Sequence, residues 1–176
     1  MKFGGTSVGK PQNMHGVAKL ITADDQVKIV VLSAISGTTN TLVEISGLLL
    51  KGDRVAAKQK IDALEQQYRL FVNELVTKGE YKQKAEEVLK EHFEFLNIIL
   101  KISYSEALYK DILAQGELLS TKLFSVYLSE QEIQHELISA LDFMTLDVDG
   151  EPQIGNIKVK LTQLLQQFPV KKLFIH

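Results

Sequence analysis

Apolar and polar positions follow two alternating patterns along much of the chain, one typical of strands and one typical of helices. Residues 27–34 (VKIVVLSA) form a nearly continuous, β-branched apolar run, which indicates a strand covered on both faces, as in a parallel sheet. Apolar side chains spaced by three or four predict a helix on each side of this strand, over residues 11–23 and about 41–50. By the same criteria, a strand, a helix and a last strand are predicted over residues 134–140, about 157–168 and 171–175. The alternation predicts an α/β fold with a mainly parallel sheet.

One long segment, about residues 53–104, interrupts this alternation because it contains no predicted strand. Its apolar residues predict two consecutive amphipathic helices separated near Gly79. The first apolar stripe consists of Ile61, Leu64, Tyr68, Phe71 and Leu75, and the second of Ala85, Val88, Leu89, Phe93, Leu96 and Leu100. Two such helices form a helical hairpin, which we expect to be a lid or an insertion that contacts a partner. Its charged residues are interpreted as a solvated face without chemistry.

The first residues of the chain, 2–9 (KFGGTSVG), predict the end of a strand, a glycine turn and the entrance to a helix. Two adjacent glycines allow backbone conformations closed to other residues and let a ligand approach the amides closely. Consecutive amides before a helix form a concave site for phosphate, and the ammonium of Lys2 is placed to reach the same phosphate. Glycines also occur in strand-to-helix turns that bind nothing, so both interpretations stay open at this point.

The same stretch nearly matches the nucleotide-binding P-loop, which has a glycine, four residues and then Gly-Lys-Ser/Thr. Gly4, Gly9 and Lys10 fit this spacing, but position 11 is Pro11, so the hydroxyl that would bind Mg²⁺ is missing. Pro11 instead suits the first position of a helix, where its missing N–H costs nothing. We therefore reject the P-loop.

A second turn follows the strand at residues 33–40 (SAISGTTN) and is rich in hydroxyl groups. Ligands of open α/β sheets bind at the carboxyl ends of the strands, so both turns are expected to face one crevice. Hydroxyls and an amide there suit a small polar molecule. Helix capping alone also explains these residue types.

A largely apolar helix is predicted after Gly116, and it carries Glu117 near its start. A carboxylate in a mostly apolar helix is costly unless it is paired, and the helix dipole stabilises it near the N-terminus. Glu117 is therefore either a structural ion pair or cap, or the carboxylate that holds the ammonium of a substrate.

Composition excludes several classes of protein. The chain has 20 Lys and Arg against 22 Asp and Glu, a net charge of −2, which favours neither nucleic acid nor anionic membrane as a partner. It has no run of ~18 apolar residues, no apolar signal segment and no cysteine, so we expect a cytoplasmic protein. The four histidines are scattered, and acids in 147–151 match only half of a calcium loop. No metal site is predicted.

Three motifs, in order, resemble those of aspartate kinases in the amino acid kinase family. They are residues 2–7 (KFGGTS), residues 31–40 (VLSAISGTTN) and Gly116-Glu117. The first is similar to the opening of the aspartate-specific branch, and the second follows at the expected distance. The similarity runs over all 176 residues, including the helical insertion. It implies a three-layer αβα sandwich with a mainly parallel sheet and a helical-hairpin insertion.

The resemblance also implies an activity: transfer of a phosphoryl group from ATP with Mg²⁺ to the side-chain carboxylate of L-aspartate, giving 4-phospho-L-aspartate. In this family, that is the first step towards lysine, threonine and methionine. By the resemblance, Lys2 is catalytic and neutralises charge on the migrating phosphoryl group. The phosphate and ATP site would comprise Lys2, Gly4, Gly5, Thr6, Ser7 and Ser33, and the aspartate site Ser33, Thr39 and Glu117. The resemblance also implies that the complete protein is a homo-oligomer, namely a dimer.

Part of the family's pattern does not occur in residues 1–176. The Gly-Arg-Gly-Gly-Ser-Asp segment, the nucleotide-binding half and the regulatory domains are missing. We therefore expect this chain to be the N-terminal, acceptor-substrate lobe, which alone binds ATP poorly and turns over negligibly. Two alternatives stay open: a glutamate or acetylglutamate kinase, against which the first motif and Thr39-Asn40 argue, and a non-catalytic module for ligand binding or assembly.

Overall fold

The fold is built on a four-stranded parallel sheet with the strand order β1-β2-β4-β3. A computed structural model describes residues 1–168 and 173–175 of the chain. The strands are β1 (Lys2–Phe3), β2 (Lys28–Leu32), β3 (Glu136–Leu137) and β4 (Leu173–Ile175). Every pairing is parallel; Phe3 pairs with Leu32, and Ile29 with Phe174.

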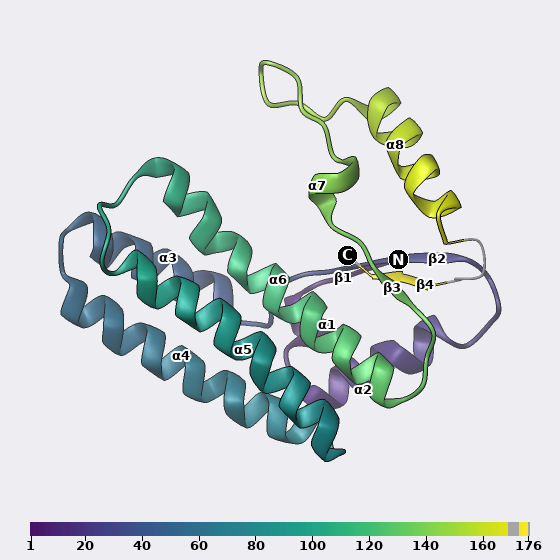
Figure 1. Cartoon of the computed structure of the whole chain (residues 1–176), viewed down its shortest axis with the longest axis horizontal. Helices are drawn as coiled ribbons and strands as arrows, with labels where there is room; N and C mark the ends of the chain where they lie inside the picture. Colours follow the sequence, from purple (N-terminus) through teal and green to yellow (C-terminus); the bar gives the residue numbers. More distant parts are fainter. Residues whose placement is uncertain (169–172, 176) are drawn as a thin grey trace.

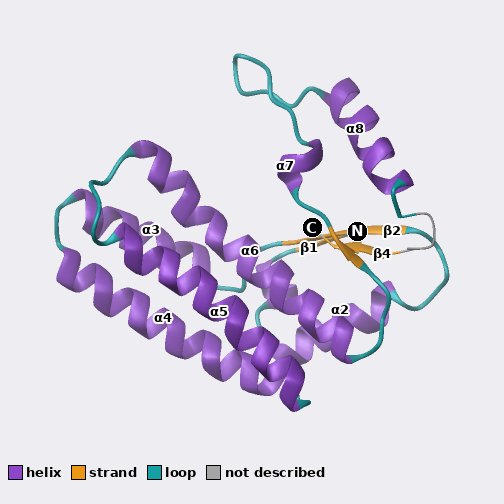
Figure 2. Cartoon of the chain, in the orientation of Figure 1, coloured by secondary structure: helices purple, strands orange, loops and turns teal. Residues whose placement is uncertain are grey.

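Helices cover both faces of this sheet (Figures 1 and 2). The helices are α1 (Gly5–Val8), α2 (Pro11–Ile21), α3 (Thr38–Leu50), α4 (Arg54–Leu75), α5 (Gly79–Ile99), α6 (Glu106–Glu130), α7 (Ala140–Phe143) and α8 (Ile154–Gln166). In Figure 1, α7 and α8 lie above the sheet, α2 lies below it, and the long helices α3 to α6 extend to its left. The predicted α/β sandwich with a parallel sheet is confirmed.

Alternation along the strands divides the apolar side chains between two cores. Val30 and Leu32 of β2 point into a large core shared with helices α2 to α6. Ile29 and Phe174 belong to a smaller core on the opposite face, with side chains of α7 and α8. Successive residues of a strand face opposite sides, so one buried strand supplies both cores, as its continuous apolar run predicts.

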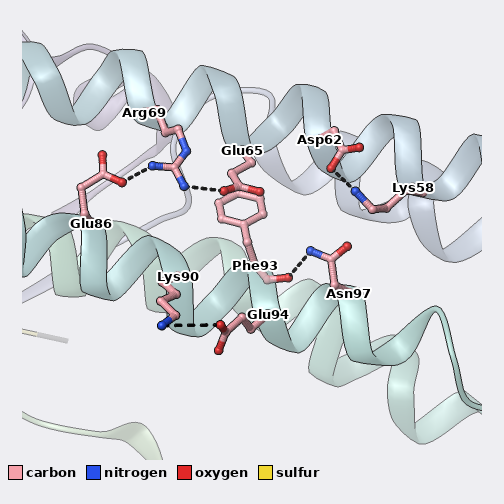
Figure 3. A network of polar contacts seen from close by, with 9 residues as sticks. All are labelled: Lys58, Asp62, Glu65, Arg69, Glu86, Lys90, Phe93, Glu94 and Asn97. Carbon is pink, nitrogen blue, oxygen red and sulfur yellow. Dashed lines mark hydrogen bonds and ion pairs between the residues drawn. The ribbon is translucent and has the colours of Figure 1, made fainter.

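Helices α4 and α5 form the predicted hairpin, and they pack firmly against the rest of the fold. The apolar stripe of α4 is buried against α2 and α3, whereas α5 packs on α6. On the outer surface, Arg69 of α4 pairs with Glu65 on its own helix and with Glu86 on α5 (Figure 3). Such exposed pairs contribute little individually. Because the apolar stripes of both helices are buried in the large core, the hairpin is part of that core and is not packed as a free lid would be.

Several element boundaries differ from those predicted by the sequence. The strand predicted over 134–140 is reduced to β3, because Ser139 caps α7 by accepting a hydrogen bond from Leu141 N at 3.2 Å. Helix α3 begins earlier than predicted, at Thr38, and α6 begins at Glu106. Residues 171 and 172 of the predicted last strand lie outside the described residues. Across the described ranges, no helix has the length and apolarity needed to cross a bilayer.

Candidate functional site

The glycine turn and the second turn touch each other, as predicted. A Cβ at Gly9 would lie 2.8 Å from the carbonyl oxygen of Gly5 and 3.0 Å from Cβ of Ser36. A Cβ at Gly5 would lie 3.1 Å from the carbonyl oxygen of Ala34. A larger residue at Gly9 would require the backbone to shift, and one at Gly5 would require its neighbour to give way slightly, so glycine at both positions lets the two turns lie this close. A Cβ at Gly4 would meet nothing within 4 Å, which leaves open space beside that residue.

The second turn continues the sheet and then starts α3. The backbone N–H of Ser33 donates to the carbonyl oxygen of Phe3 at 3.0 Å. Gly37 has a φ of +88°, a left-handed conformation that favours glycine, and α3 starts directly after it. Thr38 points into the core, whereas Thr39 is exposed. The prediction that Thr39 belongs to a loop is thus wrong: it lies in the first turn of a helix.

Helix α6 reaches the same place through Gly116. A Cβ at Gly116 would lie 2.9 Å from Cβ of Ala34 and 3.3 Å from Cγ2 of Thr38. The helix backbone therefore lies directly on the second turn, and the next residue, the half-buried Glu117, lies beside that contact. Because α6 begins at Glu106, the prediction that Glu117 is near a helix N-terminus is wrong. The helix dipole acts at the ends of a helix, so it cannot be what stabilises this carboxylate.

Helix α4 contributes a side chain that the sequence analysis assigned only to the core. The hydroxyl of Tyr68 lies 2.9 Å from Oγ1 of Thr38, within a buried hydrogen bond. Burial raises the pKa of Tyr68 well above its usual range, the bond to Thr38 opposes that rise, and the negative charge of Glu117 adds to it. Tyr68 therefore stays neutral, and its hydroxyl lies within the electrostatic reach of Glu117.

A cavity of about 220 Å³ lies where the two turns meet α4. Gly9, Ile35, Ser36 and Thr38 line it from the turns, and Gln67, Tyr68 and Phe71 line it from α4. At the sequence level, the stripe on α4 has the spacing of any amphipathic helix, so nothing in the pattern separates Tyr68 from its core neighbours. Its hydroxyl, a polar group in an apolar stripe, is the one feature of the sequence that distinguishes Tyr68 from those neighbours.

Lys2 and the exposed residues of the glycine turn occupy the other side of this junction. Phe3 contacts the large core, so alternation along β1 places Lys2 on the opposite face, in register with Val31. Lys2, Thr6 and Ser7 are exposed, and the side chain of Asn13 donates to the carbonyl oxygen of Thr6 at 2.8 Å. Contacts between these residues and a phosphate stay predictions.

The junction combines two groups of residues, the exposed glycine turn and the partly buried contact of α6 with the start of α3. Exposed amide and hydroxyl groups of the glycine turn suit a charged phosphate. A half-buried carboxylate and an exposed hydroxyl at the start of α3 suit an amino acid. Among the described residues, no group of three or more His, Asp or Glu lies where it could hold a metal ion.

A sequence model of the amino acid kinase family matches residues 1–170. The chain belongs to the amino acid kinase family. Its relatives within this family are aspartokinases, as the three motifs predict. The lysine-sensitive aspartokinase 3 of Escherichia coli (strain K12) is 34% identical over 133 residues, which are 76% of this chain and 29% of that protein. The chloroplastic aspartokinase 2 of Arabidopsis thaliana is 36% identical over 137 residues, 74% of this chain and 24% of that protein.

Solved structures of this amino acid kinase family share the fold over almost the whole chain. The crystal structure of E. coli aspartokinase III in complex with aspartate and ADP matches with a TM-score of 0.78 and 28% identity. The match covers 99% of this chain and 39% of that chain. The chain therefore spans under two fifths of the solved relative, and less than a third of each of the two sequence relatives.

Proposed function

We propose that this chain is the acceptor-substrate lobe of an aspartokinase, which phosphorylates the side-chain carboxylate of L-aspartate with ATP. The observation that carries the proposal is the meeting of three motifs far apart in sequence. Gly5 and Gly9 lie against the second turn, and Gly116 lies against the same turn from α6. The E. coli relative of the same fold was solved with aspartate and ADP, which supports the choice of substrates.

In the proposed reaction, the bond between the γ-phosphorus of ATP and the bridging oxygen breaks, and a carboxylate oxygen of aspartate bonds to phosphorus. ADP leaves with the bond's electron pair, and 4-phospho-L-aspartate forms. This chemistry requires positioning and charge stabilisation more than covalent help. Mg²⁺ would accompany ATP as part of the substrate.

The proposed roles are divided between residues that would hold the phosphate and residues that would hold aspartate. Lys2 would neutralise charge on the migrating phosphoryl group, and the amides of Gly4 and Gly5 would hold its oxygens. Thr6 and Ser7 extend this exposed site, and Ser33 lies at the end of β2, where the two substrates would meet. The exposed Thr39 and half-buried Glu117 would hold aspartate, Glu117 through the ammonium group.

The remainder of an active enzyme would come from outside the 176 residues. We expect this chain alone to bind ATP poorly and to turn over negligibly. The complete protein would be a cytoplasmic homodimer acting at the start of lysine, threonine and methionine synthesis. Aspartate-dependent phosphorylation by the chain alone would contradict the view that it is only the acceptor lobe.

A direct test uses both the chain and a chimaera. In the chimaera, this chain replaces the matching segment of E. coli aspartokinase 3, and acyl phosphate is trapped as hydroxamate. We expect hydroxamate with L-aspartate and not with L-glutamate. NMR titration of the chain alone with L-aspartate should shift the amide signals of Thr39 and Glu117.

Substitution of Glu117 provides the sharper arm of this test. Glu117→Ala should abolish aspartate use by the chimaera and leave its thermal melting unchanged. The matched control is Glu94→Ala, because Glu94 is an exposed glutamate of α5 in a surface pair with Lys90. Survival of activity in Glu117→Ala would remove Glu117 from the site. A folded but inactive chimaera, together with no aspartate-induced shifts in the chain, would favour a non-catalytic module, and use of glutamate would favour a different acceptor.

A further inference from the structure

Tyr68 links the helical hairpin to the start of α3 through one buried hydrogen bond. Its hydroxyl lies 2.9 Å from Oγ1 of Thr38, and the two side chains belong to residues only 2% and 3% exposed. The ring of Phe93 on α5 meets the Tyr68 ring edge-on, with centroids 5.9 Å apart and planes at 64°. This arrangement is favourable for aromatic pairs, so packing from α5 fixes the direction of the hydroxyl.

Thr38 is fixed on every side by this environment. Its hydroxyl bonds to Tyr68, and its backbone N–H donates to the carbonyl oxygen of Ile35 at 3.0 Å. Its methyl group faces Gly116, where a Cβ would come within 3.3 Å. A side chain with its oxygen and its methyl group both held has one rotamer, so the backbone that carries it is held as well.

The neighbours of these two fixed points are the groups proposed to bind aspartate. Thr39 follows Thr38 in the first turn of α3, and Glu117 follows Gly116 on α6. The side chain of Thr39 is exposed, so little of its position is set by packing of its own. The helix backbone that carries it is held by the buried Thr38 next to it.

We infer that Tyr68 is a positioning residue of the acceptor site, which holds Thr38 and thereby fixes Thr39 relative to Glu117. The inference rests on the proposed function and extends it: the helical hairpin, to which the proposed reaction assigns no substrate contact, sets the geometry in which an amino acid with a side-chain carboxylate is bound. Sites of this kind depend on neighbours that lock the groups that touch the substrate.

The hydroxyl of Tyr68 can be removed without disturbing the ring. In the chimaera, Tyr68→Phe should raise the KM for L-aspartate about 3- to 10-fold, the range expected for one hydrogen bond, and leave the KM for ATP unchanged. Thr38→Val should have the same effect. The double variant should be no worse than either single variant, because both changes remove the same bond.

Two controls separate positioning from stability. Tyr127→Phe makes the same chemical change in another buried tyrosine of the large core, one that stacks on His15, and should leave the KM for aspartate unchanged. Thr38→Ser keeps the hydroxyl and should retain most of the affinity. If Tyr68→Phe fails to fold, the contrast between Thr38→Val and Thr38→Ser tests the same bond.

A measurement without any ligand separates this inference from the proposed function. In NMR spectra of the 176-residue chain, Tyr68→Phe and Thr38→Val should both shift the Thr39 amide and speed its hydrogen exchange, whereas Tyr127→Phe should not. An unchanged Thr39 amide and an unchanged KM for aspartate would overturn the inference even if the wild-type chimaera is active. Conversely, a shifted Thr39 amide in a chain whose wild type does not bind aspartate would show that Tyr68 holds Thr39 in place and would count against the proposed function.

Discussion

The two faces of the sheet differ in how completely helices cover them. On one face, helices α2 to α6 share a single large core with β2. On the other face, α7 and α8 cover a small core, and α8 has no fully buried residue. Thr38 and Gly116 lie on the thickly covered face, whereas Lys2 projects on the thinly covered one. Buried packing thus holds Thr38 and Gly116 in place, whereas Lys2 is exposed to solvent.

The largest expected effect is on stability, and it compares matched leucines on the two faces. Leu89 of α5 is fully buried, and Leu161 of α8 is only partly buried. Leu89→Ala should lower the free energy of unfolding by about 2–5 kcal/mol, and Leu161→Ala by less than half of that loss. Urea denaturation of the chain measures both. Equal losses of unfolding free energy would show that the thinly covered face is as tightly packed as the thickly covered one.

The next largest effect is on the rate of phosphoryl transfer, and thermal melting serves as the control for stability. Lys2 is exposed, so Lys2→Ala should leave thermal melting unchanged. In the chimaera, it should raise the barrier to phosphoryl transfer by about 2–4 kcal/mol, the range for a preorganised electrostatic group. The same substitution at Lys19, an exposed lysine of α2, is the control and should leave the rate unchanged. A normal rate in Lys2→Ala would place phosphate stabilisation elsewhere.

A moderate loss of stability is expected when the contact between α6 and the start of α5 is removed. Oε1 of Glu130 accepts backbone N–H bonds from Thr77 and Lys78, both at 2.6 Å. Burial alone would raise the pKa of Glu130, but these bonds outweigh it and hold that pKa below its usual value. A lowered pKa gives stability that is fully present above pH 4.5, the unfolded value, and is lost as pH falls through the folded value.

Glu130→Gln should therefore cost about 1–3 kcal/mol at pH 7 and flatten the loss of stability seen in acid. Urea denaturation at pH 7 and in the acid range measures both effects. The matched control is Glu132→Gln, since Glu132 is exposed just beyond the end of the helix. If the variant kept the acid dependence of the wild type, Glu130 would not be its source.

The smallest expected effect is a pH dependence of the stability, which comes from a histidine on the thickly covered face. Nδ1 of His92 on α5 lies 2.5 Å from Oε1 of Gln115 on α6, and burial lowers the pKa of His92. The unfolded chain takes up this proton first, so stability should decline as pH falls below 6.5, by at most about 1.4 kcal/mol per pH unit.

His92→Leu should remove this decline, and urea denaturation between pH 7.5 and 5.5 compares the two slopes. Since His15 is only half-buried, His15→Leu should leave the slope in place. An identical slope in wild type and His92→Leu would show that the imidazole is protonated in the folded chain as readily as in the unfolded one.

The sequence predicted the features that depend on local pattern. The β-branched run of β2, the hairpin and the glycine turn all follow from residue type and spacing. The rule that ligands bind at the carboxyl ends of parallel strands predicted that the two turns lie together. The predicted helix start at Gly116, in contrast, is wrong, because α6 begins at Glu106. Gly116 packs closely on Ala34, and only the tertiary structure identifies this partner.

Side-chain partners across the core could not be predicted in the same way. Tyr68 has the same spacing as its apolar neighbours, and Thr38 looks like any hydroxyl in a turn. Their bond joins residues 30 positions apart, and no local rule links them. Glu130 is similar, since its partners at Thr77 and Lys78 belong to a connection between two other helices.

The contact at Gly116 has a mechanical consequence. On the α6 side, no rotatable bond separates the helix from the turn, because the closest point of the helix is bare main chain. The nearest atom on the other side is Cβ of Ala34, which has no rotamers, so rotamer changes at this point cannot alter the spacing of the two elements, as they could at a contact made by long side chains. The spacing between α6 and the second turn is therefore fixed at this contact, even where other parts of the molecule flex.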